Sequence, residues 1–438
     1  MNGQAVISAR QLALLAGVSV DRRAIRFEHD ERILRAMSGD AAALFASLLR
    51  SPSLDRLFDA GLVRFRESEF LVEGAELVLE VERQEVVSYP QEWPTAMLHE
   101  AGLATARLGA TLAFEGLGLL DAHPWNILFA GSRATWVDLG SIAPVQRISS
   151  SWVAEFRRHV VLPLALRRLG WQTMADAVWR DHPGDGVKAL WERRPIPTLF
   201  PMGYARATRQ RAPAAFFENL ERYLLGMRVE PRRGEWSGYG QAGGVAVGDT
   251  ERYDPKQRAV DTYLGDLAPG LVIDVGANAG WYSELAVRHG NRVIAVDMDD
   301  VTLSQLFRRA QAQALPIQPL RLNVMWPTGS HGLGLALSAA PDRLRADTSL
   351  WLAVVHHLVG RQHLSFATVA RAIDQFTKHA AIVEFIPRED VHVRTWQVAD
   401  EPWYDADHFI AAMAPYFPRV DILPSSPEPR VMLCFRRA

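Results

Sequence analysis

Apolar runs of strand length alternate with helical patterns through residues 256–438. The strand-like runs are residues 271–276, 292–298, 317–324, 349–358 and 380–387, and the helical patterns between them are 281–290, 299–315 and 365–378. Apolar strands that alternate with helices indicate a parallel sheet covered on both faces. The final apolar runs, 419–424 and 430–437, flank the turn SSPEP with no helix between them. They predict an antiparallel hairpin that closes the sheet.

The pattern differs in the part of the chain that precedes this region. Residues 1–225 mix helical patterns with short strands, such as those in FRESEFLVEGAELVLEVE (65–82), and indicate an α+β domain. Residues 226–255 are rich in glycine and charge, with weak periodicity, as expected of a linker. The predicted organisation is therefore a domain over 1–225, a linker over 226–255 and an α/β domain over 256–438.

Composition narrows the class of protein. The chain has 438 residues, with 48% hydrophobic and 22% charged, and a net charge of -2, which is typical of a globular protein without a global attraction to nucleic acid or anionic membrane. The single cysteine, Cys434, excludes an intrachain disulfide and a zinc site built from cysteines. The first residues do not resemble a signal peptide, and no apolar run is long enough to span a membrane, so we expect a cytoplasmic protein. No basic and aromatic module for nucleic acid is evident, and the sequence leaves the oligomeric state open.

The segment VIDVGANAGWYS (272–283) carries the clearest chemical signal. Its spacing is DxGxNxG, with Asp274 two residues before Gly276, whereas the NAD fingerprint is GxGxxG and places a pyrophosphate at a helix N-terminus. A carboxylate at this point repels a pyrophosphate and favours a ligand with positive charge, such as S-adenosylmethionine (SAM). Two alternatives stay open: a NAD site, and glycines that only allow tight packing of the strand against the helix.

The acid at the end of the next apolar run supports a nucleoside ligand. Asp297 ends RVIAVDM, where a carboxylate can accept hydrogen bonds from both ribose hydroxyls, a device that NAD enzymes share. Together with the terminal hairpin, DxGxNxG and VIAVDMD resemble the first motifs of class I SAM-dependent methyltransferases, with a seven-stranded Rossmann-like sheet. The resemblance implies a SAM site in which Asp274, Gly276, Asn278 and Gly280 surround the methionine part and Asp297 binds the ribose. Met298 would pack on the adenine or in the core. Asn323 stands where relatives have an acid that contacts the adenine amine.

Candidates for proton transfer follow the fourth and fifth apolar runs. We interpret the fourth strand as ending in Val355-His356-His357-Leu358, and the fifth runs into Glu384. A histidine has a pKa suited to general-base work at neutral pH, so His356, His357 and Glu384 are the predicted catalytic residues. The alternative for each is structural: paired histidines in a packed turn, and an acid satisfied by an arginine or a helix N-terminus.

A second string of polar residues lies in LLDAHPWNILFAGSRATWVDLGSI (119–142). Asp121 and Asn126 lie five residues apart and Asp138 follows, as in the catalytic and metal-binding string of kinases and aminoglycoside phosphotransferases, which this stretch resembles. The resemblance is incomplete, because lysine occurs only at 188, 256 and 378 and no glycine-rich loop lies upstream.

Three interpretations of the first region therefore remain. The prediction is a degenerate, pseudokinase-like domain with a structural or substrate-docking role. An arginine could substitute for the missing lysine, yet its pKa and its fork geometry differ. An active phosphotransferase and a chance similarity are the alternatives. No metal site is predicted, apart from the weaker possibility of magnesium on Asn126 and Asp138 with Asp121.

Motifs from both regions together resemble one family. SYPQEWPTAMLHEAG, LLDAHPWNILF, WVDLGSI, FRRHVVLPLAL, DVGANAG, VVHHL and VEFIPRED are similar to segments of the two-part bacterial proteins related to the nodulation protein NoeA. The resemblance implies SAM-dependent methyl transfer to an O, N or C nucleophile of a small molecule or glycan. A bifunctional methyltransferase and phosphotransferase, or a SAM-binding scaffold without catalysis, are the alternatives.

Overall fold

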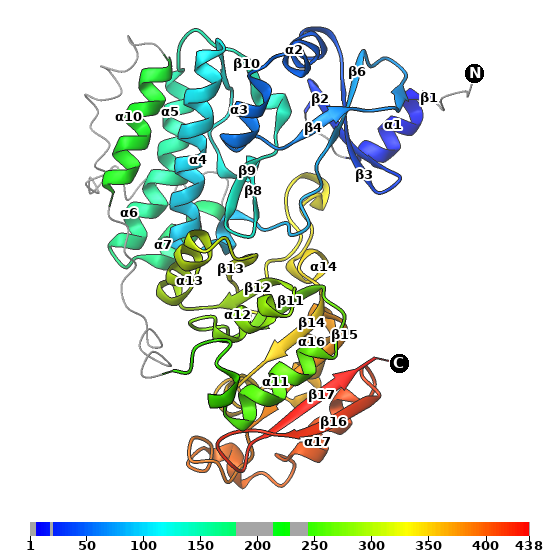
Figure 1. The fold of residues 1–438 in the computed structure, drawn as a ribbon, viewed down its shortest axis with the longest axis vertical. Coiled ribbons are helices and arrows are strands. Elements are labelled where there is room, and N and C mark those ends of the chain that lie inside the picture. Colours follow the sequence, from blue (N-terminus) through cyan, green and yellow to red (C-terminus); the bar gives the residue numbers. More distant parts are fainter. Residues whose placement is uncertain (1–5, 18–20, 181–212, 228–243, 438) are drawn as a thin grey trace. The chain divides into compact units, whose positions relative to one another are not determined.

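The computed structural model describes residues 6–17, 21–180, 213–227 and 244–437. Within it the chain divides into two compact units (Figure 1). Unit 1 comprises Met1–Gln91, Thr95–Arg232 and His331–Ala336, and unit 2 comprises Glu92–Pro94, Arg233–Ser330 and Leu337–Ala438. The main division, at residues 232 and 233, falls inside the segment predicted as a linker, of which residues 228–243 lie outside the described residues.

A seven-stranded sheet forms the centre of unit 2. Its strand order is β13-β12-β11-β14-β15-β17-β16, and the strands are β11 (Leu271–Val275), β12 (Arg292–Asp297), β13 (Ile317–Arg321), β14 (Ala346–Trp351), β15 (Thr377–Phe385), β16 (Arg419–Pro424) and β17 (Val431–Arg436). The first five pair in parallel, whereas β17 pairs antiparallel with both β15 and β16. The predicted parallel sheet with a closing antiparallel hairpin is therefore confirmed.

β14, the strand that we expected to end in the paired histidines, is shorter than predicted. β14 ends at Trp351, and His356 and His357 lie in the following helix, α15 (Val355–Gly360), so the prediction that this strand extends through 355–358 is wrong. The apolar run SLWLAVV continues past the strand because Leu352 after it and Val355, the first residue of the helix, are also buried, while the two residues between them are partly buried. An unbroken apolar run does not reveal where a buried strand passes into a buried helix.

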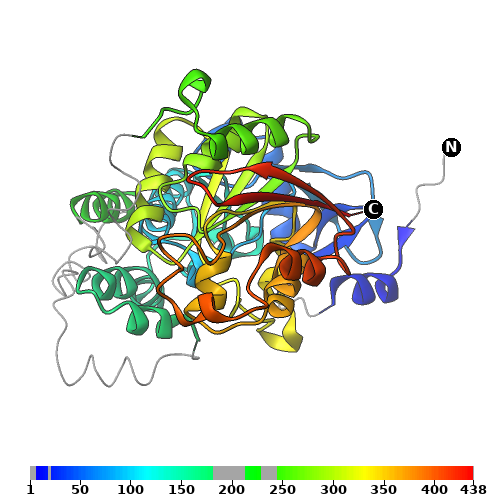
Figure 2. The same ribbon diagram turned by 90° about the horizontal axis from the view of Figure 1, so that it is seen from below.

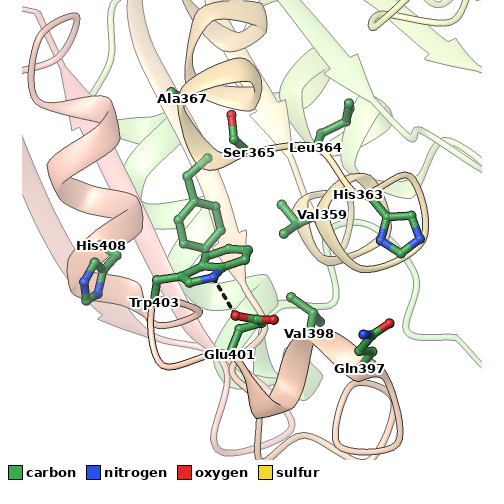
Figure 3. A pocket seen from close by; sticks show the side chains of 11 residues that line it. Val359, His363, Leu364, Ser365, Ala367, Gln397, Val398, Glu401, Trp403 and His408 are labelled. Carbon is green, nitrogen blue, oxygen red and sulfur yellow. Dashed lines mark hydrogen bonds between the residues drawn. The ribbon is translucent and has the colours of Figure 1, made fainter.

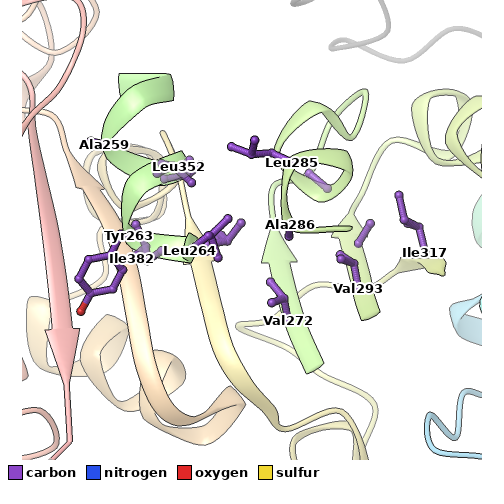
Figure 4. Packing of buried hydrophobic residues seen from close by; sticks show 14 of the residues in the cluster. Ala259, Tyr263, Leu264, Val272, Leu285, Ala286, Val293, Ile317, Leu352 and Ile382 are labelled. Carbon is purple, nitrogen blue, oxygen red and sulfur yellow. The ribbon is translucent and has the colours of Figure 1, made fainter. Parts of the chain in front are cut away.

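Helices cover both faces of this sheet (Figure 2). One face carries α11 (Pro255–Gly265), α12 (Trp281–Arg288) and α13 (Asp300–Ala312), and the other carries helices that include α16 (Phe366–Phe376) and α17 (Ala406–Met413). Unit 2 also contains α14 (Ala340–Arg343) and the 3-10 turns η5 (Thr250–Arg252) and η7 (Gln397–Asp400), whereas the 3-10 turn η6 (Leu333–Leu335) belongs to unit 1. Figure 4 shows the core beneath the first group, where Leu264, Leu285 and Ile382 are fully buried. Burial of each such side chain contributes about 1.5–3 kcal/mol.

Unit 1 combines a small antiparallel sheet with a helical part. The four-stranded sheet has the order β2-β3-β6-β4, formed by β2 (Ala24–His29), β3 (Arg32–Met37), β6 (Leu77–Val81) and β4 (Phe65–Glu67). Next to it in the chain lie β1 (Val6–Ile7) paired with β5 (Leu71–Val72), and helices α1 (Ala9–Ala16), α2 (Gly39–Leu49) and α3 (Leu54–Asp59). The strands expected in 65–82 are β4, β5 and β6.

The helical part of unit 1 contains two short antiparallel strand pairs, and Asp121, Asn126 and Asp138 lie in the segments between their strands. β7 (Leu117–Leu119) pairs with β10 (Ile142–Pro144), and β8 (Ile127–Ala130) pairs with β9 (Arg133–Trp136). The described helices here are α4 (Thr95–Phe114), α5 (Ser150–Phe156), α6 (Leu162–Arg168), α7 (Gln172–Arg180) and α10 (Pro213–Gly226), with the π-helical turn η4 (Arg157–Val161) and the 3-10 turns η1 (Pro90–Glu92), η2 (Pro124–Asn126) and η3 (Leu139–Ser141). No helix among the described residues has both the length and the hydropathy needed to cross a bilayer.

Candidate functional site

The glycine turn connects β11 to α12 at the carboxyl edge of the sheet in unit 2. Gly276 and Gly280 have φ values of 74° and 81°, which favour glycine. A Cβ on Gly276 would lie 2.7 Å from Val354 Cγ2, and one on Gly280 would lie 2.5 Å from Leu306 Cδ1. The turn thus depends on both glycines, for backbone conformation and for space.

Asp274 lies at the end of β11, beneath this turn. Its side chain is 2% exposed, and Ser283 Oγ donates a hydrogen bond to Asp274 Oδ2 at 2.6 Å. Burial raises the pKa of the Asp274 carboxyl to about 6, partly opposed by the bond from Ser283. A carboxylate held here penalises an anionic ligand and is compensated by a cationic one.

Asp297 and Asn278 meet across the turn. The backbone N–H of Asn278 donates to Asp297 Oδ2 at 2.8 Å, and the N–H groups of Met298 and Asp299 donate to Asp297 Oδ1 at 2.6 and 3.0 Å. A carboxylate accepts about four hydrogen bonds, so Oδ2 retains capacity for a donor such as a ribose hydroxyl. Asn278 Oδ1 is buried and has no hydrogen-bond partner, an unsatisfied acceptor at the turn.

Met298 and Asn323 are the two remaining predicted SAM contacts; the first is exposed, and the second is bound to the backbone. Met298 is 54% exposed and is therefore not a core residue, which was one of its two interpretations. Asn323 Oδ1 accepts the backbone N–H of Met325 at 2.9 Å, so this oxygen already stabilises the turn after β13. In that turn Trp326 is 79% exposed, an apolar surface that the sequence analysis did not single out.

Glu384, the predicted acid on β15, belongs to a buried ionic network. It is fully buried, Lys256 Nζ donates to its Oε2 at 2.7 Å, and Ser425 Oγ donates to its Oε1 at 3.0 Å. Arg430 Nη1 lies 3.9 Å from Oε1 and also binds Asp390. This matches the structural alternative for Glu384, an acid satisfied by cations, and its catalytic role stays a prediction.

Sequence reasoning missed Lys256 as a site residue. It lies in α11, its ammonium is 5.3 Å from the centre of the Tyr282 ring, and its charge also acts on Asp274. The signal that could have found it is its rarity, since it is one of three lysines in a chain that otherwise uses arginine.

The paired histidines stack on an indole. The His356 ring lies 4.0 Å from that of His357 and 5.6 Å from that of Trp396, between ring centres. Burial, and then the charge of His357, lowers the pKa of His356 to about 3. His356 is therefore neutral at pH 7 and too weakly basic for the predicted role at that pH, whereas His357 is only partly buried and stays the better candidate.

In unit 1 the predicted kinase-like residues lie close to short strands in the chain, and one of them, Asp138, is influenced by the charge of an arginine. Asp121 follows β7, Asn126 ends η2, and Asp138 follows β9. Burial raises the pKa of the Asp138 carboxyl, while the charge of Arg35 on β3 lowers it. Among the described residues no group of three or more His, Cys, Asp or Glu side chains is arranged to hold a metal ion. The magnesium alternative includes Asn126 and only two aspartates, so it stays a prediction.

Arg35 reaches from the small sheet to the segment that carries Asp138. Its guanidinium donates to the carbonyls of Ala24 and Val137 at 3.0 and 3.1 Å and lies 3.7 Å from Asp21 Oδ2. Asn126 Nδ2 and Asp21 Oδ2 are buried without a hydrogen-bond partner. An internal guanidinium therefore supplies positive charge to a cluster of carboxylates in which a phosphotransferase would use a lysine and metal ions.

Comparison with known proteins identifies a relative along nearly the whole chain. No family model matches. The chain is 29% identical over 450 residues to the nodulation protein NoeA of Rhizobium meliloti (strain 1021), covering 93% of both proteins. The chain is a homologue of NoeA. The predicted resemblance to the NoeA family is confirmed, and it spans both units.

Solved structures match about two fifths of the chain. The PH0226 protein of Pyrococcus horikoshii OT3 is 12% identical, with a TM-score of 0.32, over 41% of this chain and 89% of that protein. Magnesium protoporphyrin IX methyltransferase (ChlM) of Synechocystis PCC 6803, solved with SAM, is 15% identical, with a TM-score of 0.29, over 41% and 79%. The bifunctional kinase-methyltransferase WbdD is 17% identical, with a TM-score of 0.31, over 42% of this chain and 40% of WbdD. Because these scores are low, the fold description rests on the strand order of the chain itself.

Proposed function

We propose that this homologue of NoeA is a SAM-dependent methyltransferase acting on a nucleophilic O, N or C atom of a small molecule or glycan. The observation that carries the proposal is the pairing of Asn278 with Asp297 across the glycine turn, directly above the buried carboxylate of Asp274. The turn lies at the carboxyl edge of a parallel sheet, which is where open α/β sheets bind ligands.

The residues at this edge fit SAM better than a dinucleotide. Asp297 Oδ2 and Asn278 Oδ1 offer free acceptor capacity to the hydroxyl and amino groups of a nucleoside and an amino acid. Asp274 disfavours a pyrophosphate and is compensated by the ammonium and sulfonium of SAM. The exposed Met298 supplies an apolar surface for an adenine ring.

When bound, SAM supplies an electrophilic methyl group, so the protein has to position the acceptor and remove a proton. The segments that follow β14 and β15 are the places for these tasks, since β14 pairs in parallel with β11, and β15 with β14, so all three strands end at the same edge of the sheet. His357 is the candidate base, while Lys256 and Glu384 hold the α11 side of the site in place through their buried ion pair.

A bifunctional enzyme that also phosphorylates is the alternative proposal. Unit 1 holds Asp121, Asn126 and Asp138 in the region where a phosphotransferase would need them. Arg35 argues against this alternative, because its guanidinium donates to two backbone carbonyls, lies 3.7 Å from Asp21 Oδ2 and is influenced by the charge of Asp138, so it is already engaged by protein groups. We therefore propose a structural or substrate-docking role for unit 1.

Calorimetry with SAM and with ATP–magnesium on the full chain separates these proposals. Binding of SAM without binding of ATP supports the methyltransferase, whereas ATP binding that is lost in Asp138→Ala supports a bifunctional enzyme. Mass spectrometry of a metabolite extract incubated with isotopically labelled SAM then distinguishes an enzyme from a scaffold, because only an enzyme transfers the label to a product.

A further inference from the structure

A pocket of about 520 Å³ opens among the segments that follow β14 and β15 in unit 2 (Figure 3). This volume lies within the range of about 300–1,000 Å³ that is usual for small-molecule sites. Val359 and Leu364 line it from the end of α15, and Val398 and Trp403 line it from the segment around η7. The pocket is separate from Asp274, Asp297 and the other predicted SAM contacts, none of which lines it.

The walls of the pocket are apolar and contain one carboxylate. Trp403 Nε1 donates to Glu401 Oε2 at 2.9 Å, which fixes the carboxylate beside the indole, and the Phe366 ring packs at 5.4 Å from the Trp403 ring. Glu401 is the one acidic residue in the lining, and no lysine or arginine lines the pocket in the described part of the chain.

Among the described residues Glu401 forms no salt bridge. Arg388 acts on Asp405 and donates to the carbonyls of Pro402 and Tyr404, so its charge is directed to that turn. Glu401 Oε1 thus offers an acceptor next to an aromatic face, an arrangement that attracts a cation or an N–H donor. The negative charge of Glu401 also disfavours phosphates and carboxylates.

The pocket lies within reach of the glycine turn. Val354, directly before α15, is in contact with Gly276, where an added Cβ would lie 2.7 Å from Val354 Cγ2. The six residues of α15 span about 9 Å at 1.5 Å per residue, and Val359 near its end already lines the pocket. The pocket and the glycine turn therefore lie at opposite ends of α15.

We propose that this pocket binds a small aromatic amine, with its ring between Leu364, Val398 and Trp403 and its nitrogen at Glu401. The proposal that the pocket binds an aromatic amine rests only on the residues that line it and does not depend on methyl transfer. Its assignment as the site for the distal part of the methyl acceptor rests on the proposed function.

The test uses tryptamine and indole-3-acetate as probes of matched shape and opposite charge, measured by ligand-detected NMR on the full-length protein. Tryptamine is expected to bind at least about tenfold more tightly than indole-3-acetate, equivalent to about 1.4 kcal/mol. Equal binding, preference for the acid or no binding of either probe overturns the proposal. Tighter binding of a methyl glycoside than of tryptamine also overturns it, in favour of a sugar pocket.

Two variants locate the binding. Glu401→Gln keeps an oxygen for Trp403 Nε1 and should remove the preference for the amine, while Leu364→Trp should fill the pocket and remove both probes. SAM affinity, measured in parallel, should not change in either variant. Tryptamine binding without SAM binding would refute the proposed function and leave the pocket assigned; SAM binding without tryptamine binding would do the reverse.

Discussion

At the scale of single residues, Asp297 is the side chain on which nucleoside binding depends most directly. Asp297→Ala should weaken SAM binding by about 1–3 kcal/mol, because hydrogen bonds to a charged acceptor are lost. Calorimetry with SAM measures this change. Asp299→Ala is the matched control: Asp299 caps α13 through the N–H groups of Val301 and Thr302, so its loss should reduce stability by about 1 kcal/mol and leave SAM affinity nearly unchanged. Unchanged affinity in Asp297→Ala would contradict the assignment.

Two buried groups near the site should oppose each other in the pH dependence of stability. The pKa of Asp274 is raised to about 6 in the folded state, so between about pH 4 and 6 the folded chain holds the extra proton and the free energy of unfolding falls as pH rises, by about 3 kcal/mol in total. The pKa of His356 is lowered to about 3, so from about pH 3 to 6.5 the unfolded chain holds the extra proton and the free energy of unfolding rises with pH.

Single variants separate these opposite slopes. Asp274→Asn should make the free energy of unfolding rise more steeply between pH 4 and 6 than in the unmodified chain, and His356→Gln should make it fall over the same range. Urea unfolding at several pH values measures both. Parallel curves for the unmodified chain and Asp274→Asn would mean that the carboxyl is not protonated in the folded state at pH 5.

At the scale of elements, the glycine turn connects β11 to α12 under steric constraint. Gly280→Ala should destabilise unit 2 by about 2–4 kcal/mol, since it combines a left-handed backbone with a Cβ placed 2.5 Å from Leu306 Cδ1. Gly290→Ala is the control: its φ is 79°, but the nearest atoms to its Cβ are at 3.6 Å, so only the backbone term of about 1–2 kcal/mol applies. Chemical unfolding measures both, and equal losses would show that Leu306 yields without strain.

The elements also show what the sequence could predict. β11, β12, α13 and the terminal hairpin follow from apolar runs bounded by glycine, proline and acids, because these residues stop strands and helices locally. The boundary between β14 and α15 did not, since both are buried and neither a glycine nor a proline separates them. The partners of Glu384 could not be predicted either: Lys256 and Ser425 lie 128 and 41 residues away in the chain, and only folding brings them together.

At the scale of the whole molecule, unit 2 is expected to bind SAM, whereas unit 1 is not expected to bind ATP–magnesium. If SAM binds unit 2 at a concentration of 100 times Kd, it should stabilise that unit by about 2.7 kcal/mol, which raises the melting temperature of a unit of this size by roughly 5–10 °C. ATP–magnesium should shift no transition, because Arg35 already compensates the carboxylates of unit 1.

Differential scanning calorimetry of the full chain tests this expectation. Two transitions, of which SAM moves one, would agree with units that unfold separately; Asp297→Ala should abolish that shift and leave the other transition in place. A transition that moves with ATP–magnesium, and stops moving in Asp138→Ala, would contradict the structural role proposed for unit 1. It would show that Arg35 leaves the carboxylates when nucleotide and metal bind, and that the chain carries two activities.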